Sequence, residues 1–212
     1  MSGLIAKDFI VLKNNSKFYL ILLALYFVIG LFSDLSTFMI GMMAVLGVSF
    51  VLSTFSYDEA AKWDQYSLSL AVTRREMVRA KYLVTLLLTG ITTVAGFVLC
   101  LIMQLIHQTV NLQENLFNLI GLFGGILLVC SLMLPFIYRF GVEKGRAAMI
   151  LCILGVAGLI LLFCWLADHT PLLSILGKSP LLTALLAVAL LCFFVYLSYS
   201  ISLKIYRNKE LS

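Results

Sequence analysis

The sequence predicts an all-helical integral membrane protein, with residues 1–212 forming a single transmembrane domain of six spanning helices. Of the 212 residues, 62% are hydrophobic and only 12% are charged, whereas a soluble domain has about a quarter of its residues charged. The apolar stretches are uninterrupted, which excludes an outer-membrane barrel, because its strands alternate apolar and polar residues. The bases gather in the short connections between these stretches, as in multi-pass membrane proteins.

Six apolar runs approach or exceed the length of about 20 residues that a helix needs to cross the hydrocarbon core. They are Phe18 to Phe32, Thr37 to Ser56, Tyr82 to Ile106, Leu116 to Tyr138, Ala147 to Ala167 and Leu181 to Leu203. The first run is short, and only Ser33 to Ser36 separate it from the second. These two spans are therefore expected to form a tight hairpin.

The residues before the first span, about 3–15, are predicted to form a short interfacial helix. Ile5, Phe9 and Leu12 fall on one side of such a helix, and Lys7 falls opposite them. This pattern is typical of a helix that lies in the membrane interface. A frayed tail is the alternative.

The positions of the lysines and arginines predict the orientation. All of them except Lys178 fall before the first span, after the last, or in connections on the same side of the membrane. Because basic residues are retained in the cytoplasm, both termini are predicted to be cytoplasmic in a bacterial cell membrane. The net charge of +5 is thus a topology signal, and no nucleic-acid partner is expected.

Groups for catalysis are missing from the predicted spans. All acidic residues lie outside them, His107 and His169 lie at outer ends, and the five cysteines lack CxxC spacing. We therefore expect no catalytic residue, no metal site and no enzyme activity in this chain. The polar residues inside the spans are neutral and suit interhelical hydrogen bonds or bonds to their own helix: Thr85, Thr89, Thr92, Thr93, Gln104, Asn118 and Ser131.

The 57–81 segment, Tyr57 to Lys81, is the only long polar stretch between spans. Asp58 is predicted to cap a first short helix that carries Trp63 and Tyr66 on one side. Ser67 to Val72 alternates and predicts an extended or irregular link, and Thr73-Arg-Arg-Glu76 matches a capping box that starts the third span. For any single residue, a solvated loop is an equally good interpretation.

The run DEAAKWDQYSLSLAVTRREMVRAKYL within this region resembles the signature of small bacterial ABC-2 type transporter permeases. An acidic pair, an aromatic residue, a tyrosine, an LSL-like turn and a helix start of the form (T/S)RxExVxxKY occur in that order. Ala71 stands where many relatives have a proline. The length, the six spans and the short outer loops also match that family. Its members include permeases similar to those that export phenol-soluble modulins and other amphipathic peptides.

The resemblance implies that the 57–81 segment holds a coupling helix, which sits in a groove of a separate ATPase subunit. Two permeases, as a homodimer or with a sister chain, and two ATPases would form the exporter. ATP and magnesium would bind the partner, since this chain has no GxxxxGK(S/T) loop. The implied contact and supporting residues are Asp58, Glu59, Trp63, Tyr66, Leu68, Ser69, Leu70, Thr73, Arg74 and Glu76.

Further positions are expected to contribute to contacts and packing. Arg139, Glu143 and Lys144 form a secondary ATPase contact, or serve topology alone. In the outer segment 168–180, Leu172, Leu173, Ile175 and Leu176 are too apolar for a wet loop, so a re-entrant helix at an outer gate competes with an interface-lying loop. Gly121 and Gly125, with Gly124 beside them, form a small-residue GxxxG face for close helix contact. Internal packing is favoured over a dimer seam, and Pro135 can kink the fourth span.

Two classes of function therefore compete. The first is the permease of an ATP-driven exporter for a hydrophobic or amphipathic substrate. The second is a non-transporting membrane protein, such as an immunity or sensor-anchoring subunit. An intramembrane enzyme is a distant third, because the spans contain no ionisable residue.

Overall fold

A computed structural model describes residues 2–14, 16–32, 36–69, 72–106, 112–145 and 180–208, together with the helical positions 147, 150–151, 154–155 and 157–158. Every secondary-structure element in this part of the chain is a helix. The helices are α1 (Ser2–Asn14), α2 (Ser16–Phe32), α3 (Ser36–Ala60), α4 (Trp63–Ser69), α5 (Arg74–Ile106), α6 (Leu112–Phe140) and α9 (Pro180–Asn208).

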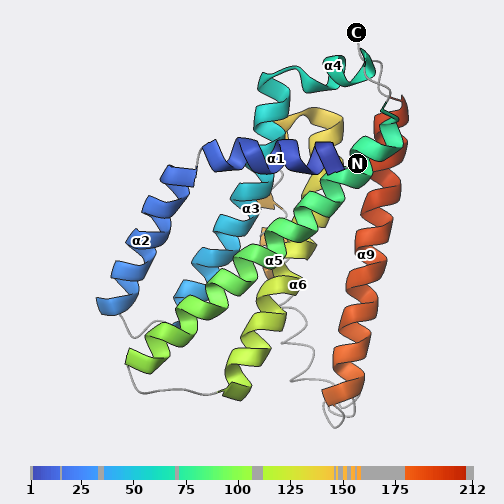
Figure 1. The fold of residues 1–212 in the computed structure, drawn as a ribbon. Coiled ribbons are helices and arrows are strands. Elements are labelled where there is room, and N and C mark those ends of the chain that lie inside the picture. Colours follow the sequence, from blue (N-terminus) through green and yellow to red (C-terminus); the bar gives the residue numbers. More distant parts are fainter. Residues whose placement is uncertain are drawn as a thin grey trace.

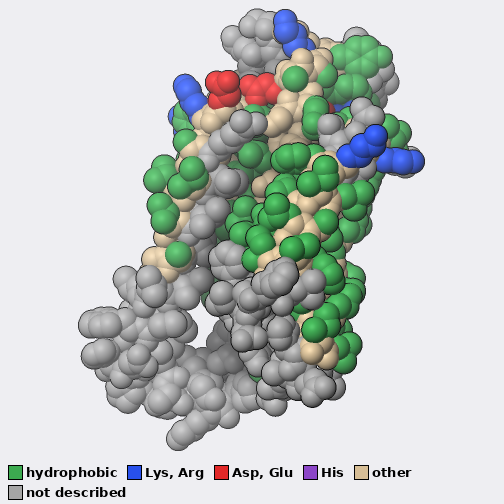
Figure 2. Space-filling view, turned by 90° about the vertical axis from the view of Figure 1, so that its left-hand side faces the viewer, with side chains coloured by type: hydrophobic (Ala, Val, Ile, Leu, Met, Phe, Trp, Pro, Cys, Tyr) green, Lys and Arg blue, Asp and Glu red, His purple; other side chains and the backbone are tan. Residues whose placement is uncertain are grey.

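Helices α3, α5, α6 and α9 form the centre of the bundle, and α2 stands at its periphery (Figure 1). Helix α1 lies across one end of the bundle, where α4 and the start of α5 also lie (Figure 1). We call this the basic end, since Lys and Arg side chains gather toward it while hydrophobic side chains cover the flank (Figure 2). A crosswise position at one end is what the predicted interfacial helix requires of α1.

Four helical segments are long and apolar enough to span a membrane. They are Gly41–Ala60, Arg74–Ile106, Phe117–Phe140 and Val188–Asn208, and Lys17–Ile29 is a shorter apolar helix. The predicted fifth span and the outer-gate residues Leu172, Leu173, Ile175 and Leu176 lie mostly or wholly outside the described residues. The described part therefore supports a multi-pass membrane protein, and the count of six spans stays a prediction.

One face of α1 packs on the bundle. Leu12 is buried, and Ile5 and Phe9 pack against the core, whereas Ile10 is exposed. The predicted apolar side of this helix is thus confirmed. Lys7, predicted to lie opposite this side, is also turned to the bundle, because its ammonium group pairs with Asp58 of α3.

The threonines of α5 bond within their own helix. Thr85, Thr89, Thr92 and Thr93 each donate to a carbonyl three or four residues earlier. The hydroxyl groups of these threonines therefore need no partner on another helix. Small residues let α3 and α5 approach closely, and Gly47 of α3 faces Thr92 of α5. A Cβ added at Gly47 of α3 would lie 2.9 Å from the Thr92 Oγ1 atom.

This close approach makes Gly47 sensitive to a single added methyl group. We expect Gly47→Ala to lower the free energy of unfolding by about 1–3 kcal/mol, because Thr92 and Ile126 leave no room. Gly90→Ala is the matched control, since nothing lies within 4 Å of a Cβ there and alanine favours a helix by about 1 kcal/mol. Thermal unfolding in detergent measures both; equal losses would contradict this packing.

The predicted GxxxG face is not a close contact in the described part of the chain. A Cβ at Gly121 or Gly125 would meet no atom within 4 Å, whereas one at Gly124 would lie 3.2 Å from Leu191 of α9. Among the described residues, the close contact on this face is therefore made by Gly124, the glycine beside the GxxxG pair. Helix α6 continues through Pro135 to Phe140.

At the end of the bundle opposite the basic end, α5 and α6 are joined by two buried amides. Gln104 Nε2 donates to Asn115 Oδ1 over 2.7 Å, and Asn115 Nδ2 donates back to Gln104 Oε1 over 2.5 Å. Both side chains satisfy each other, so their burial carries no unpaired amide cost. This pair fixes the register of the two helices at the end opposite the basic end.

Candidate functional site

The 57–81 segment folds as the end of α3, a tight turn, α4 and the start of α5. Helix α3 continues to Ala60, so Asp58 lies inside its last turns, and the predicted cap by Asp58 is wrong. The turn depends on Lys62, whose φ of 49° is left-handed, and its N–H donates to the Glu59 carbonyl over 3.1 Å. Ser67 to Ser69 are helical rather than extended.

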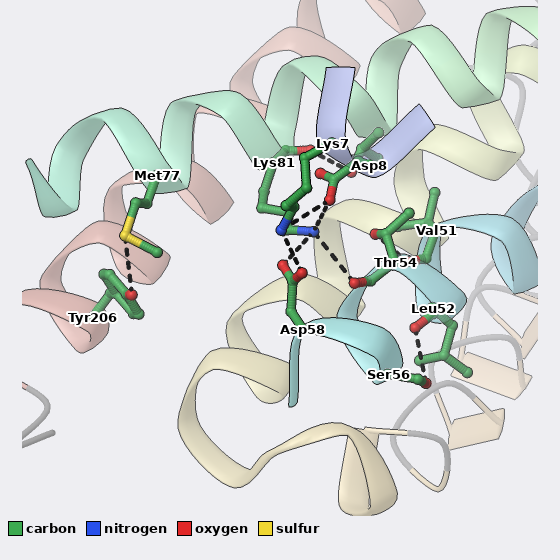
Figure 3. Close-up of polar contacts among 11 residues, drawn as sticks. Lys7, Asp8, Val51, Leu52, Thr54, Ser56, Asp58, Met77, Lys81 and Tyr206 are labelled. Atoms are coloured by element: carbon green, nitrogen blue, oxygen red, sulfur yellow. Dashed lines mark hydrogen bonds and ion pairs between the residues drawn. The ribbon is translucent and has the colours of Figure 1, made fainter. Parts of the chain in front are cut away.

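Four charged side chains from three helices form an ion cluster beside this turn: Lys7 and Asp8 of α1, Asp58 of α3 and Lys81 of α5. Lys81 Nζ lies 3.0 Å from Asp8 Oδ1 and 2.7 Å from Asp58 Oδ2. Lys7 Nζ pairs with Asp58 and lies 3.3 Å from Asp8 Oδ1. Figure 3 shows both ammonium groups side by side with the two carboxylates around them.

Asp8 and Lys81 of this ion cluster are buried, whereas the side chains of Lys7 and Asp58 are 21% and 16% exposed. Asp8 is 3% exposed and Lys81 is 9% exposed, and Lys81 also donates to the Thr54 carbonyl over 3.4 Å. The cluster contains two cations and two anions, so its net charge is zero. The attraction between opposite charges offsets the free-energy cost of removing these groups from water. The ion cluster therefore ties α1 and α5 to the end of α3 from which α4 continues.

Aromatic rings extend these contacts to α4. Lys7 Nζ lies 4.1 Å from the centroid of the Trp63 ring, and that ring lies 5.5 Å from the ring of Tyr66. A cation over an aromatic face is attracted to it. Beside these groups is a cavity of about 120 Å³, lined from α1, α3, α4, α5, α6 and α9.

A second link joins α3 to the segment that follows α6. Glu59 Oε2 accepts the N–H of Val142 over 2.7 Å. Gly141, which directly precedes Val142, has a φ of +82°. A Cβ atom added to it would lie 3.0 Å from Glu59 Oε1. Glycine is thus required both by the backbone and by the approach of the carboxylate. Val142 begins a helical turn, so Glu59 acts as a cap supplied from a distant part of the chain.

Removing this cap should have a measurable cost. We expect Glu59→Ala to lower the free energy of unfolding by about 1–2 kcal/mol, because the Val142 N–H loses its acceptor. Glu143→Ala is the control, since Glu143 is exposed and should change stability by less than about 0.5 kcal/mol. Thermal unfolding of both variants in detergent tests this, and a similar loss in the control would rule out a specific cap.

The predicted capping box at the start of α5 is confirmed. The Thr73 N–H and hydroxyl donate to Glu76 Oε2 over 2.9 and 2.7 Å, and the Glu76 N–H donates to Thr73 Oγ1 over 3.3 Å. Arg74, the next residue after Thr73, contacts another helix. Its guanidinium donates to the carbonyls of Tyr206 and Arg207 at the end of α9. Arg74 therefore has a structural role within the chain.

The structure divides the residues that the sequence assigned to an ATPase contact. Asp58, Trp63 and Arg74 are engaged in internal contacts, whereas Tyr66 is 57% exposed on α4. The side chains of Leu68 and Ser69, and all of Leu70, lie outside the described part. Arg139, Glu143 and Lys144 are exposed beside the Gly141 turn, close to the 57–81 segment through the Glu59 bond.

The sequence interpretation missed Lys7, Asp8 and Lys81. One signal was available, because Asp8 is an acidic residue one turn before Leu12 on the apolar face of α1. An acid at such a position needs a buried partner. Its partner lies 73 residues away, on a helix whose bases also serve topology.

Comparison with known proteins identifies the kind of molecule to which this site belongs. A profile described as ABC-2 family transporter protein matches residues 3–207. The chain belongs to the ABC-2 transporter family. It is a membrane permease of an ABC transporter, and membership of this family, whose permeases are not themselves catalytic, implies an ATPase partner. No curated protein and no solved structure matches it.

Among the described residues, no three His, Cys, Asp or Glu side chains lie close enough to hold an ion. Asp8 and Asp58 are instead paired with lysines, and Glu59 and Glu76 accept hydrogen bonds from backbone N–H groups. The ion cluster, Trp63, Tyr66 and Glu59 together are the candidate functional site.

Proposed function

We propose that this ABC-2 permease is the transmembrane half of an exporter, which moves a hydrophobic or amphipathic substrate out of a bacterial cell. ATP and magnesium bind a separate ATPase, whose two copies work with two permeases, either as a homodimer or with a sister chain. The basic end faces the cytoplasm, because basic residues are retained there. The ATPase docks on α4.

The observation that carries this proposal is the bracing of an exposed α4. Tyr66 offers an aromatic contact at the basic end, and aromatic residues are enriched at protein interfaces. The end of α3 from which α4 continues is fixed to α1 and α5 by the ion cluster and to residue 142 by Glu59. A force applied to α4 would therefore reach several helices at once.

The interior of the bundle supports an apolar cargo. The threonines of α5 bond to their own backbone, and the amides of Gln104 and Asn115 bond to each other. The hydrogen bonds of these threonines and amides are thus made within the chain, whereas carriers of sugars or ions need convergent polar ligands. An amphipathic peptide is the substrate class that we favour.

Co-purification tests the proposal. The tagged chain should be isolated from its native membrane in mild detergent, and ATP hydrolysis measured with and without amphipathic peptides. A stoichiometric ATPase with peptide-stimulated turnover is expected. A chain that purifies alone and gives no ATP hydrolysis would favour the non-transporting alternative, and a stable ATPase that no amphipathic peptide stimulates would contradict the substrate class.

A further inference from the structure

Helices α5 and α9 form a seam at the basic end, where the start of one lies beside the end of the other. Arg74 Nη1 donates to the Arg207 carbonyl over 2.6 Å, and Arg79 Nε donates to the Tyr199 hydroxyl over 3.2 Å. Further in, the Tyr82 hydroxyl lies 2.6 Å from Ser198 Oγ. These contacts hold the two helices in a fixed antiparallel register.

Four exposed cations flank this seam: Arg75 and Arg79 on α5, and Lys204 and Arg207 on α9. None of them forms an ion pair with a carboxylate in the described part of the chain. Glu76, the acid beside Arg75, accepts its hydrogen bonds from Thr73. Like charges that are held near one another repel, so an anion placed among them would be attracted by all four.

The same surface is hollowed on the α9 side. Lys204 and Arg207 line an open groove of about 430 Å³ together with Ser200, Leu203 and Asn208. The Arg79 guanidinium is held by Tyr199, which lies one helical turn before the groove residue Leu203, on the same side of α9. The groove and the arginines of α5 thus lie on neighbouring parts of one surface.

Beyond the cations, the surface becomes apolar. Leu83 and Leu86 on α5 are exposed, as are Tyr196 and Leu197 on α9. An occupant that satisfies both parts must carry an anionic group at one end and an apolar body at the other. The exposed apolar residues belong to helices that are long enough to span a membrane.

We propose that the α5–α9 seam binds the headgroup of an acidic phospholipid at the basic end of the bundle. The phosphate lies among Arg75, Arg79, Lys204 and Arg207, and the acyl chains follow the exposed leucines. Arginine matches phosphate with a planar fork of donors. Basic residues are expected at this end because of the membrane topology. The contacts between α5 and α9 explain why these four lie on one surface.

Lipid binding to the purified full-length chain tests this proposal. The probe is phosphatidylglycerol, with phosphatidylcholine as the neutral comparison, titrated in detergent and followed by native mass spectrometry. We expect the wild type to retain phosphatidylglycerol selectively. Lys204→Gln/Arg207→Gln and, separately, Arg75→Gln/Arg79→Gln should each weaken that binding by at least about tenfold, because each basic residue near a membrane surface contributes about a factor of five.

The matched control is Lys13→Gln/Lys17→Gln, which removes two exposed lysines elsewhere at the basic end. It should keep the wild-type lipid affinity, and all variants should keep the wild-type melting temperature. The Lys204→Gln/Arg207→Gln variant should fold normally, because neither side chain donates a hydrogen bond to another described residue. A loss of lipid binding in this variant can therefore be assigned to the removed charges.

Four outcomes would overturn the proposal. They are equal weakening in the control, equal binding of phosphatidylcholine, displacement of the lipid by millimolar inorganic phosphate, and loss of ATPase association in the seam variants with lipid binding intact. The third would indicate a site for a free anion, and the fourth would assign the cations to a protein partner. None of the lipid measurements depends on an ATPase, so the proposed function and this inference can fail separately.

Discussion

Replacing Lys81 with methionine should lower the free energy of unfolding by about 3–5 kcal/mol, because the substitution leaves one negative charge in excess at the largely buried ion cluster. Lys81 contacts both Asp8 and Asp58, and Lys7 alone cannot balance two carboxylates. Removing one partner from a buried ion pair costs about 3–5 kcal/mol, which is a large part of the 5–15 kcal/mol that typically stabilises a protein. The yield of monodisperse protein and its melting temperature in detergent measure the effect.

The double variant Asp8→Asn/Lys81→Met should recover most of this loss. It removes one cation and one anion, so Lys7 and Asp58 remain as a balanced pair. Lys13→Met is the control for charge removal alone, because Lys13 is exposed on α1 and should change stability by less than about 0.5 kcal/mol. If the double variant were as unstable as Lys81→Met, charge balance would not explain the role of the cluster.

Replacing Tyr66 with aspartate should abolish association with the ATPase while leaving the permease folded and inserted. The side chain is 57% exposed, so the fold loses little. A charge placed where an interface buries an aromatic ring costs at least about 2 kcal/mol, or more than tenfold in affinity. Co-purification of the ATPase with the tagged variant provides the measurement.

Two variants make this result specific. Tyr66→Phe keeps the ring and should keep association, and Lys13→Asp places the same charge at an exposed site outside the 57–81 segment. Loss of association in Lys13→Asp, or normal association in Tyr66→Asp, would contradict an interface centred on α4. A lowered melting temperature in Tyr66→Asp would assign the effect to folding.

The features that the sequence predicted correctly are local ones. The Thr73 to Glu76 box marks the start of α5 because its bonds join residues three apart. The apolar runs locate α3, α5, α6 and α9 because a spanning helix satisfies its own backbone. Ile5, Phe9 and Leu12 identify the packed face of α1 through helical periodicity alone.

The features that could not be predicted are contacts between distant segments. Asp8 meets Lys81 across 73 residues, and Glu59 meets Val142 across 83 residues. Nothing local distinguishes Lys81 from its basic neighbours, whose charge is explained by topology. Asp58 resembled a cap because Asp favours that position, but the packing of α3 against α5 carried its helix on to Ala60.

Long-range contacts also give Arg74 a different role from the one that the sequence suggested. From the sequence it was one of several bases at the end of a span, and the resemblance placed it against the ATPase. Its guanidinium instead caps the last carbonyls of α9, where the negative end of a helix favours a cation. The candidate docking surface is therefore narrower than the motif suggests, and among the described side chains it centres on Tyr66.

The central claim is that α4 docks the ATPase, and site-specific cross-linking tests it most directly. A photo-reactive phenylalanine analogue would be placed at position 66, and at position 13 for comparison, and irradiated in native membranes. We predict that position 66 captures an ATP-binding protein and that position 13 does not. An ATP-binding protein captured only at position 13, or at neither position while the intact complex co-purifies, would contradict the account.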